Sequence, residues 1–346
     1  MTARTRGRAL FLVLFAALAA ALLAAAPLGA AEDNAYTVTK IVSNRAGVAA
    51  HQDPVLQNGW GLVGGATPWW VVNNDTNTSS VYRPDGTKAL QVAVGGGPTG
   101  VVFNSNANAF PLGASAARFI FAAMDGSIRA WNGGAAASVV WTTPGAVYTG
   151  LAILGTHLYA ANLAGGVDVY GSDFHPTTVP GGFVDPALPD GWAPFGIQAI
   201  GSRIFVTFVK VGEEDGEIAE EHGQGLGIVD VFDADGNLLT RVAQHGQLNA
   251  PWGLASAPAA FGRFGGDLLV GNFGDGTIGA YEELPNGHFA YRGQLRSADS
   301  SPIVIDGLWA LEFGAGNANS GPATTLFFTA GPNEETDGLF GSITAD

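Results

Sequence analysis

The chain contains no cysteine among its 346 residues. This absence excludes disulfide bonds, a cysteine nucleophile, thiolate zinc sites and the lipid-modified cysteine of bacterial lipoproteins. Charged residues are also scarce, at 13% of the chain, and the 30 acids outnumber the 15 bases. A formal net charge of −15 makes nucleic acid and anionic lipid poor partners. The fold must therefore be stabilised by its core, and a chain of this length can bury a large one.

Long amphipathic helical patterns are missing after residue 31, and so are familiar catalytic signatures. The six histidines are scattered without an HExxH motif, and there is no Gly-x-Ser-x-Gly elbow or P-loop. Glycine is abundant, with 51 residues, and Asp-Gly pairs begin at residues 85, 125, 235 and 275. Short apolar runs bounded by Gly, Asn, Asp and Pro predict many short strands joined by tight turns.

The one long hydrophobic run lies at the N-terminus. Arg4, Arg6 and Arg8 precede an apolar stretch over 9–26, and small residues follow at 29–31. This order is typical of a cleaved secretory signal peptide, with an uncleaved membrane anchor as the alternative. We expect a signal peptide over 1–31 and a single exported domain over 32–346, periplasmic or extracellular, monomeric and without a membrane span. Cleavage removes three arginines and no acid, which takes the formal charge from −15 to −18.

A short motif recurs six times along this domain: an aromatic residue or threonine, a small residue, then an aliphatic one. The middle residues of successive copies are 39, 50, 46, 57 and 57 positions apart, and two further strand-like runs follow each copy. The copies are Trp60-Gly61-Leu62, Thr99-Gly100-Val101, Thr149-Gly150-Leu151, Phe195-Gly196-Ile197, Trp252-Gly253-Leu254 and Trp309-Ala310-Leu311. This period predicts an all-β, six-bladed β-propeller. A β-sandwich pair would not show such a repeat, and a β-helix usually has a shorter one.

The last module has only three strand-like runs before Asp346, and a fourth candidate lies at the start of the domain. Residues 36–42 alternate between apolar and polar side chains, as a half-buried strand does. We expect this N-terminal strand to complete the sixth blade. Closing the ring in this way removes strand edges that would otherwise favour aggregation.

Pro98, Pro194 and Pro251 precede the motif and apolar strands ending in Asn follow it, a pattern that resembles NHL-type propeller repeats. More closely, the domain resembles a family of exported bacterial propellers known mainly as conserved hypothetical proteins. The segments that carry this resemblance are 58–62, 249–254, 271–276, 305–309 and 328–333. The resemblance implies a propeller fold and no established activity.

The residues that open the inner strands are the first candidates for a ligand site. They are Trp60, Thr99, Thr149, Phe195, Trp252 and Trp309. Equivalent residues of all blades surround the axis, so the aromatic ones could stack on a sugar or another planar ligand at the channel mouth. Packing between blades is the alternative. We expect at least two of the three tryptophans to be partly exposed around one central opening.

Two loops share the pattern Asp-Pro-x-Leu, and both reach a tryptophan a few residues later. One carries His51 and Asp53 before Trp60, and the other carries Asp185 before Trp192. They could form two rim loops over one face. The alternative is a structural cap, in which each aspartate accepts hydrogen bonds from its own loop.

Oxygen-bearing side chains at strand ends could hold a metal ion on the axis. The candidates are Asn58, Asn73, Asn162, Asn249, Asn272 and Asp306. Carboxylate and amide oxygens suit calcium, as in lactonase-type propellers, although asparagine at a strand end is more often a turn residue. An acidic insertion over 213–222 is a solvated loop on one reading, and a cation site or lid on the other.

Two functions fit this pattern. The first is an exported, non-catalytic propeller that binds a glycan, a peptide or another component of the cell envelope. The second is a calcium-dependent hydrolase of the lactonase or esterase type, with the metal on the propeller axis. Since propellers serve both purposes, the fold does not decide between them.

Overall fold

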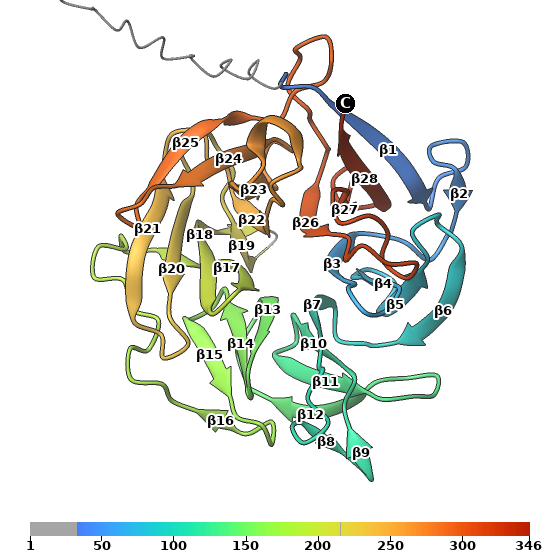
Figure 1. The fold of residues 1–346 in the computed structure, drawn as a ribbon. Helices are drawn as coiled ribbons and strands as arrows, with labels where there is room; N and C mark the ends of the chain where they lie inside the picture. Colours follow the sequence, from blue (N-terminus) through green and yellow to red (C-terminus); the bar gives the residue numbers. More distant parts are fainter. Residues whose placement is uncertain (1–32, 215) are drawn as a thin grey trace, which may run out of the picture. The chain divides into compact units, whose positions relative to one another are not determined.

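The computed structural model describes residues 33–346 except residue 215, so the signal peptide expected over 1–31 lies outside the described part. Residues 33–346 form one compact unit, in which six antiparallel sheets surround a central axis (Figure 1). The predicted six-bladed β-propeller is confirmed. Nowhere in the described residues is there a helix with the length and apolar character needed to span a membrane.

In the first three blades, the order of the four strands from the axis outward is their order along the chain. Blade 1 contains β3 (Gly59–Val63), β4 (Trp69–Asn73), β5 (Thr78–Tyr82) and β6 (Lys88–Ala93). Blade 2 contains β7 (Pro98–Phe103), β10 (Phe119–Ala123), β11 (Ser127–Trp131) and β12 (Ser138–Thr142). Blade 3 contains β13 (Tyr148–Leu154), β14 (His157–Asn162), β15 (Val167–Tyr170) and the short β16 (Pro176–Thr177). A small hairpin of β8 (Pro111–Leu112) and β9 (Ser115–Ala116) lies outside this order.

The remaining blades include an extended strand and the N-terminal one. Blade 4 contains β17 (Trp192–Ile200), β18 (Arg203–Glu214), β20 (Ile228–Phe232) and β21 (Leu238–Gln244), and β19 (Glu217–Glu220) pairs with the far end of β18. Blade 5 contains β22 (Pro251–Ser256), β23 (Leu268–Asn272), β24 (Ile278–Glu283) and β25 (Phe289–Gln294). Blade 6 contains β26 (Leu308–Phe313), β27 (Leu326–Ala330), β28 (Leu339–Ala345) and β1 (Tyr36–Ser43), to which β2 (His51–Gln52) adds in parallel.

The small residue of the repeat motif is explained by how closely the inner strands approach one another at the axis. A Cβ atom added to Gly61 would lie 2.3 Å from the carbonyl oxygen of Thr99 in the next blade. At Gly196 the corresponding distance to the carbonyl oxygen of Trp252 would be 2.2 Å. Side chains at these positions would force neighbouring blades apart, so glycine here is required by backbone packing.

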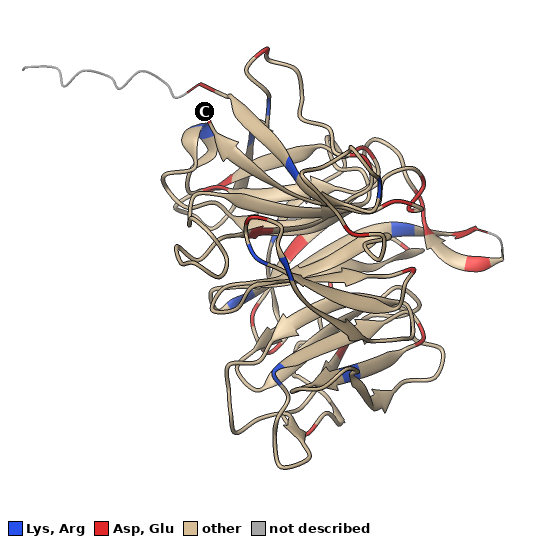
Figure 2. Ribbon diagram, turned by 90° about the vertical axis from the view of Figure 1, so that its right-hand side faces the viewer, with Lys and Arg blue, Asp and Glu red and all other residues tan. Residues whose placement is uncertain are grey.

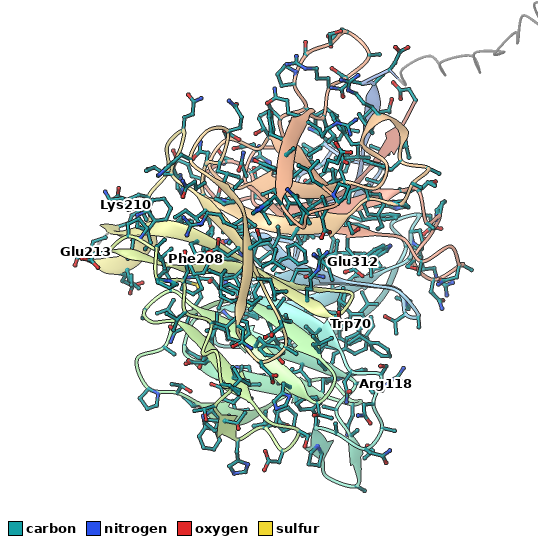
Figure 3. All side chains as sticks on the ribbon, turned by 60° about the vertical axis from the view of Figure 1, so that its left-hand side comes forward. Trp70, Arg118, Phe208, Lys210, Glu213 and Glu312 are labelled. Carbon is teal, nitrogen blue, oxygen red and sulfur yellow. The ribbon has the colours of Figure 1, made fainter. Side chains whose placement is uncertain are left out.

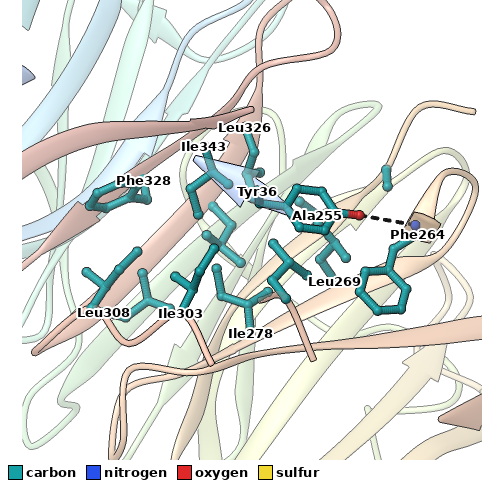
Figure 4. Packing of buried hydrophobic residues seen from close by; sticks show 14 of the residues in the cluster. Tyr36, Ala255, Phe264, Leu269, Ile278, Ile303, Leu308, Leu326, Phe328 and Ile343 are labelled. Atoms are coloured by element: carbon teal, nitrogen blue, oxygen red, sulfur yellow. Dashed lines mark hydrogen bonds between the residues drawn. The ribbon is translucent and has the colours of Figure 1, made fainter. Parts of the chain in front are cut away.

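The N-terminal strand closes the ring, as the sequence predicted. β1 pairs antiparallel with β28, from Tyr36 opposite Ala345 to Ser43 opposite Leu339. Tyr36 is buried in the cluster between blades 5 and 6, where Figure 4 shows it near Ala255 and Leu269. Its hydroxyl accepts a hydrogen bond from the Phe264 amide and donates one to the Phe261 carbonyl, both at 3.2 Å. The first strand therefore anchors in a neighbouring blade as well as in its own.

The hairpin of β18 and β19 projects beyond the other blades on one side of the ring (Figure 2). It contains most of the acidic insertion, and its red segments in Figure 2 mark the acidic residues. The described residues of the insertion thus contribute to an antiparallel hairpin, in which 211–214 pair with 217–220. Two of its residues, Val211 and Ile218, pack against a cluster that contains the inner-strand residues Trp60 and Trp309.

Candidate functional site

Three of the four aromatic residues expected around the channel mouth are buried. Trp60 is 4% exposed, and Phe195 and Trp309 are fully buried. The rings of Trp60 and Trp309 stack with their centroids 3.8 Å apart, and Phe273 stacks on the other side of Trp309 at 4.0 Å. The expectation that at least two of the tryptophans are partly exposed is therefore wrong. Trp60 and Trp309 lie near the start of the inner strands of adjacent blades. Their rings are therefore close enough to stack on each other.

Trp252 is the exception, because its half-buried side chain crosses the axis. Its indole N–H donates a hydrogen bond to the Thr149 carbonyl, 2.9 Å away in blade 3. Blades 2 and 3 have threonine where the others have an aromatic residue, and this leaves room for the indole. Each threonine hydroxyl instead donates to a backbone carbonyl of the next blade, at 2.7 Å. We call Trp60, Phe195, Trp309 and Phe273 the aromatic cluster.

Beyond Trp252, a ring of aliphatic side chains narrows the channel. The six residues, one from each blade, are Leu62, Val101, Leu151, Ile197, Leu254 and Leu311. The cavity between them is only about 20 Å³, close to the space occupied by one water molecule. This aliphatic collar separates the two ends of the channel.

At the end where the inner strands begin, a cavity of about 290 Å³ opens under the β18–β19 hairpin. Its acidic lining residues are Asp75, Glu214, Glu217, Glu220 and Glu335, and its apolar ones include Trp60, Met124, Leu163 and Ile218. No lysine or arginine of the described chain lines it. We call this cavity the acidic pocket. The acidic insertion therefore supplies three of its carboxylates, a role that the solvated-loop reading did not assign.

Asn58 holds a fixed orientation at the floor of the acidic pocket. Its side-chain oxygen accepts a hydrogen bond from the Trp309 indole N–H at 2.9 Å. An indole nitrogen can only donate, so the amide nitrogen of Asn58 must face the other way. That nitrogen donates to Glu335 Oε2 at 2.5 Å. The backbone of Asn58 has φ = 45°, a left-handed conformation that asparagine adopts more readily than most residues.

The carboxylates of the pocket lie close enough to perturb one another. Burial, and next the charge of Glu220, raise the pKa of Glu335 to about 7, against the hydrogen bond from Asn58. Burial also raises the pKa of Asp75. His222 stands 3.4 Å from Glu220, and this hydrogen bond raises the pKa of the imidazole. The site therefore combines carboxylates with a proton that titrates near neutral pH, a property typical of binding and catalytic sites.

The two Asp-Pro loops carry structural side chains. Asp53 is buried and accepts hydrogen bonds from Tyr82, at 2.5 Å, and from the Val55 amide, and it forms an ion pair with Lys88 at 2.7 Å. Burial raises the pKa of Asp53, but these partners together bring it below its usual value. Asp185 is bound by Arg241 and by the Ala187 amide.

His51 and Trp192 differ from these aspartates in their exposure. His51 is exposed on β2, and Trp192 is half-buried and lies against His245. Neither lines the acidic pocket, and the same holds for Asp53 and Asp185. The structure therefore does not bring the two loops together with the central site.

The other proposed metal ligands do not converge on the axis. Asn73 bonds to Thr78 and Ser80 within its own blade. The oxygen of Asn162 accepts from the Val147 amide, that of Asn249 from Gly223, and that of Asn272 from the Asn249 amide, while Asp306 caps Asn333. The oxygens of Asn162, Asn249, Asn272 and Asp306 are thus already satisfied by backbone amides. Asn73 Oδ1 is buried without a hydrogen-bond partner among the described residues, because the bonds to Thr78 and Ser80 are donated by its amide nitrogen. Over residues 33–346, leaving aside 215, no three His, Asp or Glu side chains are grouped to hold a metal ion.

Sequence reasoning missed the central carboxylates Asp75 and Glu335, although a signal for them exists. Both lie in the loop between the second and third strands of a blade, and the acidic insertion occupies the same place in blade 4. Aligning the modules by their strands would have predicted that the loops with Asp75, Glu335 and the acidic insertion lie at the same end of the axis.

The described chain is thus a six-bladed β-propeller with an acidic pocket at one end of its central channel. No known family model matches it. An uncharacterised protein of Acanthamoeba polyphaga mimivirus is 30% identical over 333 residues, covering 90% of this chain and 80% of the viral protein. A second uncharacterised mimivirus protein is 29% identical, covering 90% of this chain and 86% of its own length. The chain belongs to the same protein family as the first of these mimivirus proteins.

Solved structures support the fold alone. The chain is similar to streptogramin B lyase, with a TM-score of 0.55, 11% identity, and coverage of 90% of this chain and 98% of that one. It is also similar to a glucose dehydrogenase, with a TM-score of 0.53, 12% identity, and coverage of 90% and 100%. Since identity is this low, these similarities carry no information about activity.

Proposed function

We propose that the protein is a binding propeller whose acidic pocket takes a positively charged side chain of a peptide. The observation that carries this proposal is the lining of that pocket, in which five carboxylates face a cavity without lysine or arginine among the described residues. A cationic ligand would relieve the mutual repulsion that contributes to the raised pKa of Glu335.

The size and the floor of the pocket favour an organic cation. A volume of about 290 Å³ is far larger than a bare ion needs, and apolar side chains line it together with the acids. The side-chain oxygen of Asn58, which could otherwise ligate a metal ion, already accepts the hydrogen bond from the Trp309 indole N–H. The indole N–H of Trp60, which also lines the pocket, is buried and has no hydrogen-bond partner among the described residues. It could donate to a peptide carbonyl.

The buried tryptophans favour a peptide over a glycan. Sugar rings bind by stacking on an exposed aromatic face. Trp60 and Trp309 instead stack on each other, and Trp252 is occupied by its bond to Thr149. A lysine side chain needs no such platform, because its aliphatic part can lie on Leu163 and Ile218 while its ammonium group meets the carboxylates.

Calorimetric titration with a tetralysine peptide tests this proposal. At low ionic strength and about pH 8, where Glu335 is ionised, we expect binding that weakens as salt is added. Glu335→Gln should weaken it about tenfold, since one of the buried charges is lost. Glu334→Gln is the matched control, because the neighbouring Glu334 is exposed and does not line the pocket. Equal effects of the two substitutions, or equal binding of the fully acetylated peptide, would refute the pocket as the site.

A calcium-dependent hydrolase is the second candidate, because a divalent cation would also relieve repulsion between Glu335, Glu220 and Asp75. Metal analysis of protein purified without chelator, followed by calcium titration of the Glu335→Gln variant, tests it. Stoichiometric calcium and chelator-sensitive hydrolysis of a lactone would replace the binding proposal with an enzymatic one.

We further propose that the propeller is exported by its N-terminal segment. The basic, apolar and small residues over 1–31 support this. N-terminal sequencing of secreted material should find a start between Ala30 and Asn34. Cell-associated protein that retains Arg4 would contradict export.

A further inference from the structure

The end of the channel opposite the acidic pocket contains a second cavity, of about 120 Å³. The inner strands connect the two ends: Trp60 and Thr149 line the acidic pocket, whereas Val63 and Ile153, on the same strands, line the second cavity. The aliphatic collar lies between them. Figure 3 shows Glu312, which lines the second cavity, well removed from Glu213 on the acidic hairpin.

Glu312 is out of place in this cavity. Its walls include Val63, Phe103, Ile153 and Ala199, and Gln198 is the other polar side chain. Among the described residues, no second ionisable group lines the cavity. Glu312 occupies the position after the repeat motif, where blades 1, 2, 3 and 5 have valine or alanine. The repeat therefore predicts an apolar residue at this point, and the propeller has a carboxyl group instead.

The carboxyl group has one satisfied oxygen. Glu312 Oε1 accepts a hydrogen bond from the Gly64 amide at 3.2 Å, and no other hydrogen bond to this side chain is formed by the described residues. Burial raises the pKa of Glu312 to about 7, although the Gly64 amide lowers it. Glu312 is half-buried, so the apolar walls remove part of the hydration of its carboxylate, and a cation would replace what is lost.

We propose that this cavity is a second ligand site, which takes a small primary amine with an apolar body. The ammonium group would pair with the free oxygen of Glu312, and the apolar body would lie against Val63, Phe103 and Ile153. The volume limits the apolar body to about one small ring: a dry apolar cavity of about 150 Å³ encloses benzene, and this cavity, at about 120 Å³, is slightly smaller but open on one side, so the ring would be only partly enclosed. The proposal is independent of the peptide site, since the aliphatic collar and a different carboxylate separate the two.

Benzylamine is the probe, and isotope-labelled protein followed by NMR is the readout. At about pH 8 we expect benzylamine to shift the methyl signals of Val63 and Ile153, with affinity falling at least tenfold at pH 5.5 as Glu312 takes up a proton. Glu312→Gln should also weaken benzylamine at least tenfold, whereas benzyl alcohol should bind both proteins equally. Ala199→Leu, which fills part of the cavity and leaves Glu312 in the chain, should abolish both shifts.

The Glu335→Gln variant distinguishes binding at this cavity from binding in the acidic pocket. It should leave benzylamine binding at Val63 and Ile153 unchanged while it weakens tetralysine. Failure of tetralysine alone would refute the peptide site and leave this one standing. The amine site is overturned if benzylamine does not shift these methyl signals, if Glu312→Gln binds it as well as the parent does, or if Glu335→Gln removes the shifts.

Discussion

Glu335 and Glu312 lie at opposite ends of one channel, and burial raises the pKa of each to about 7. A carboxyl group whose pKa is higher in the folded than in the unfolded chain binds protons more tightly when folded. Its contribution to the free energy of unfolding therefore falls as pH rises from about 4.5 to about 7. The two carboxylates that we propose bind ligands therefore lower the free energy of unfolding of the ligand-free protein above neutral pH.

The double variant Glu312→Gln/Glu335→Gln should therefore be less sensitive to pH than the parent. Between about pH 5.5 and pH 8 we expect the parent to lose up to ~2 kcal/mol per group in the free energy of unfolding, and the variant to lose much less. Urea unfolding at the two pH values measures this. Parallel pH dependences in parent and variant would show that neither carboxyl group has a raised pKa.

Arg241 illustrates a different case, a half-buried cation that neutralises two buried carboxylates. Its guanidinium group bonds to Asp185, of which 2% of the side chain is exposed, and to Asp230, which is fully buried, at 2.9 Å. Arg241→Met leaves the buried Asp230 without its cation and Asp185 with only the Ala187 amide, so we expect a loss of about 3–5 kcal/mol. Arg203→Met, which breaks a part-exposed pair with Glu283, should cost less than about 1 kcal/mol. Thermal unfolding of both variants makes the comparison, and similar losses would contradict it.

At the scale of the element, the β18–β19 hairpin serves both stability and binding. If the insertion were only a solvated loop, replacing Glu213–Glu221 by a short Gly-Ser loop would change stability little, since surface loops tolerate changes in length. In the structure, Ile218 of this hairpin packs against the aromatic cluster. We now expect the replacement to cost about 1–2 kcal/mol and to abolish tetralysine binding.

A smaller change separates the two contributions of the hairpin. Glu214→Gln/Glu217→Gln/Glu220→Gln keeps Ile218 but removes three carboxylates of the acidic pocket. Its melting temperature should match that of the parent, while its affinity for tetralysine falls further than that of Glu335→Gln. Unchanged affinity in this triple variant would show that the hairpin does not take part in binding.

The strands were predictable from the sequence because every blade repeats the same backbone requirement. Glycine or alanine follows the first motif residue wherever inner strands meet, and this regularity indicated the number of blades and the order of the strands. The site was not predictable in the same way. Whether Trp60 or Trp252 faces the axis depends on its neighbours, a stacked Trp309 in one case and a small Thr149 in the other. Such pairings join distant blades and leave no local pattern.

At the scale of the whole molecule, the ring depends on a contact between the two ends of the domain. β1 supplies the outer strand of blade 6, and Tyr36 extends this contact to blade 5 through Phe261 and Phe264. The core clusters lie largely between neighbouring blades, so each blade is stabilised by the next. Opening the ring at one place therefore exposes apolar surface on both sides of the break.

Deletion of residues 36–42 tests the closure directly. It removes a strand from blade 6 and leaves the edge of β28 unpaired, so we expect a loss of cooperative unfolding or aggregation. Tyr36→Ala is the milder form: it keeps the backbone pairing with β28 but removes a buried ring, at a cost of about 3–5 kcal/mol. Tyr291→Ala, which truncates an exposed tyrosine, should cost less than about 1 kcal/mol and serves as its control. Calorimetry measures whether each variant unfolds in a single cooperative transition, by comparing the calorimetric enthalpy with the van't Hoff enthalpy. A deletion variant that melts in one transition at the temperature of the parent would show that the other five blades hold the ring closed without the N-terminal strand.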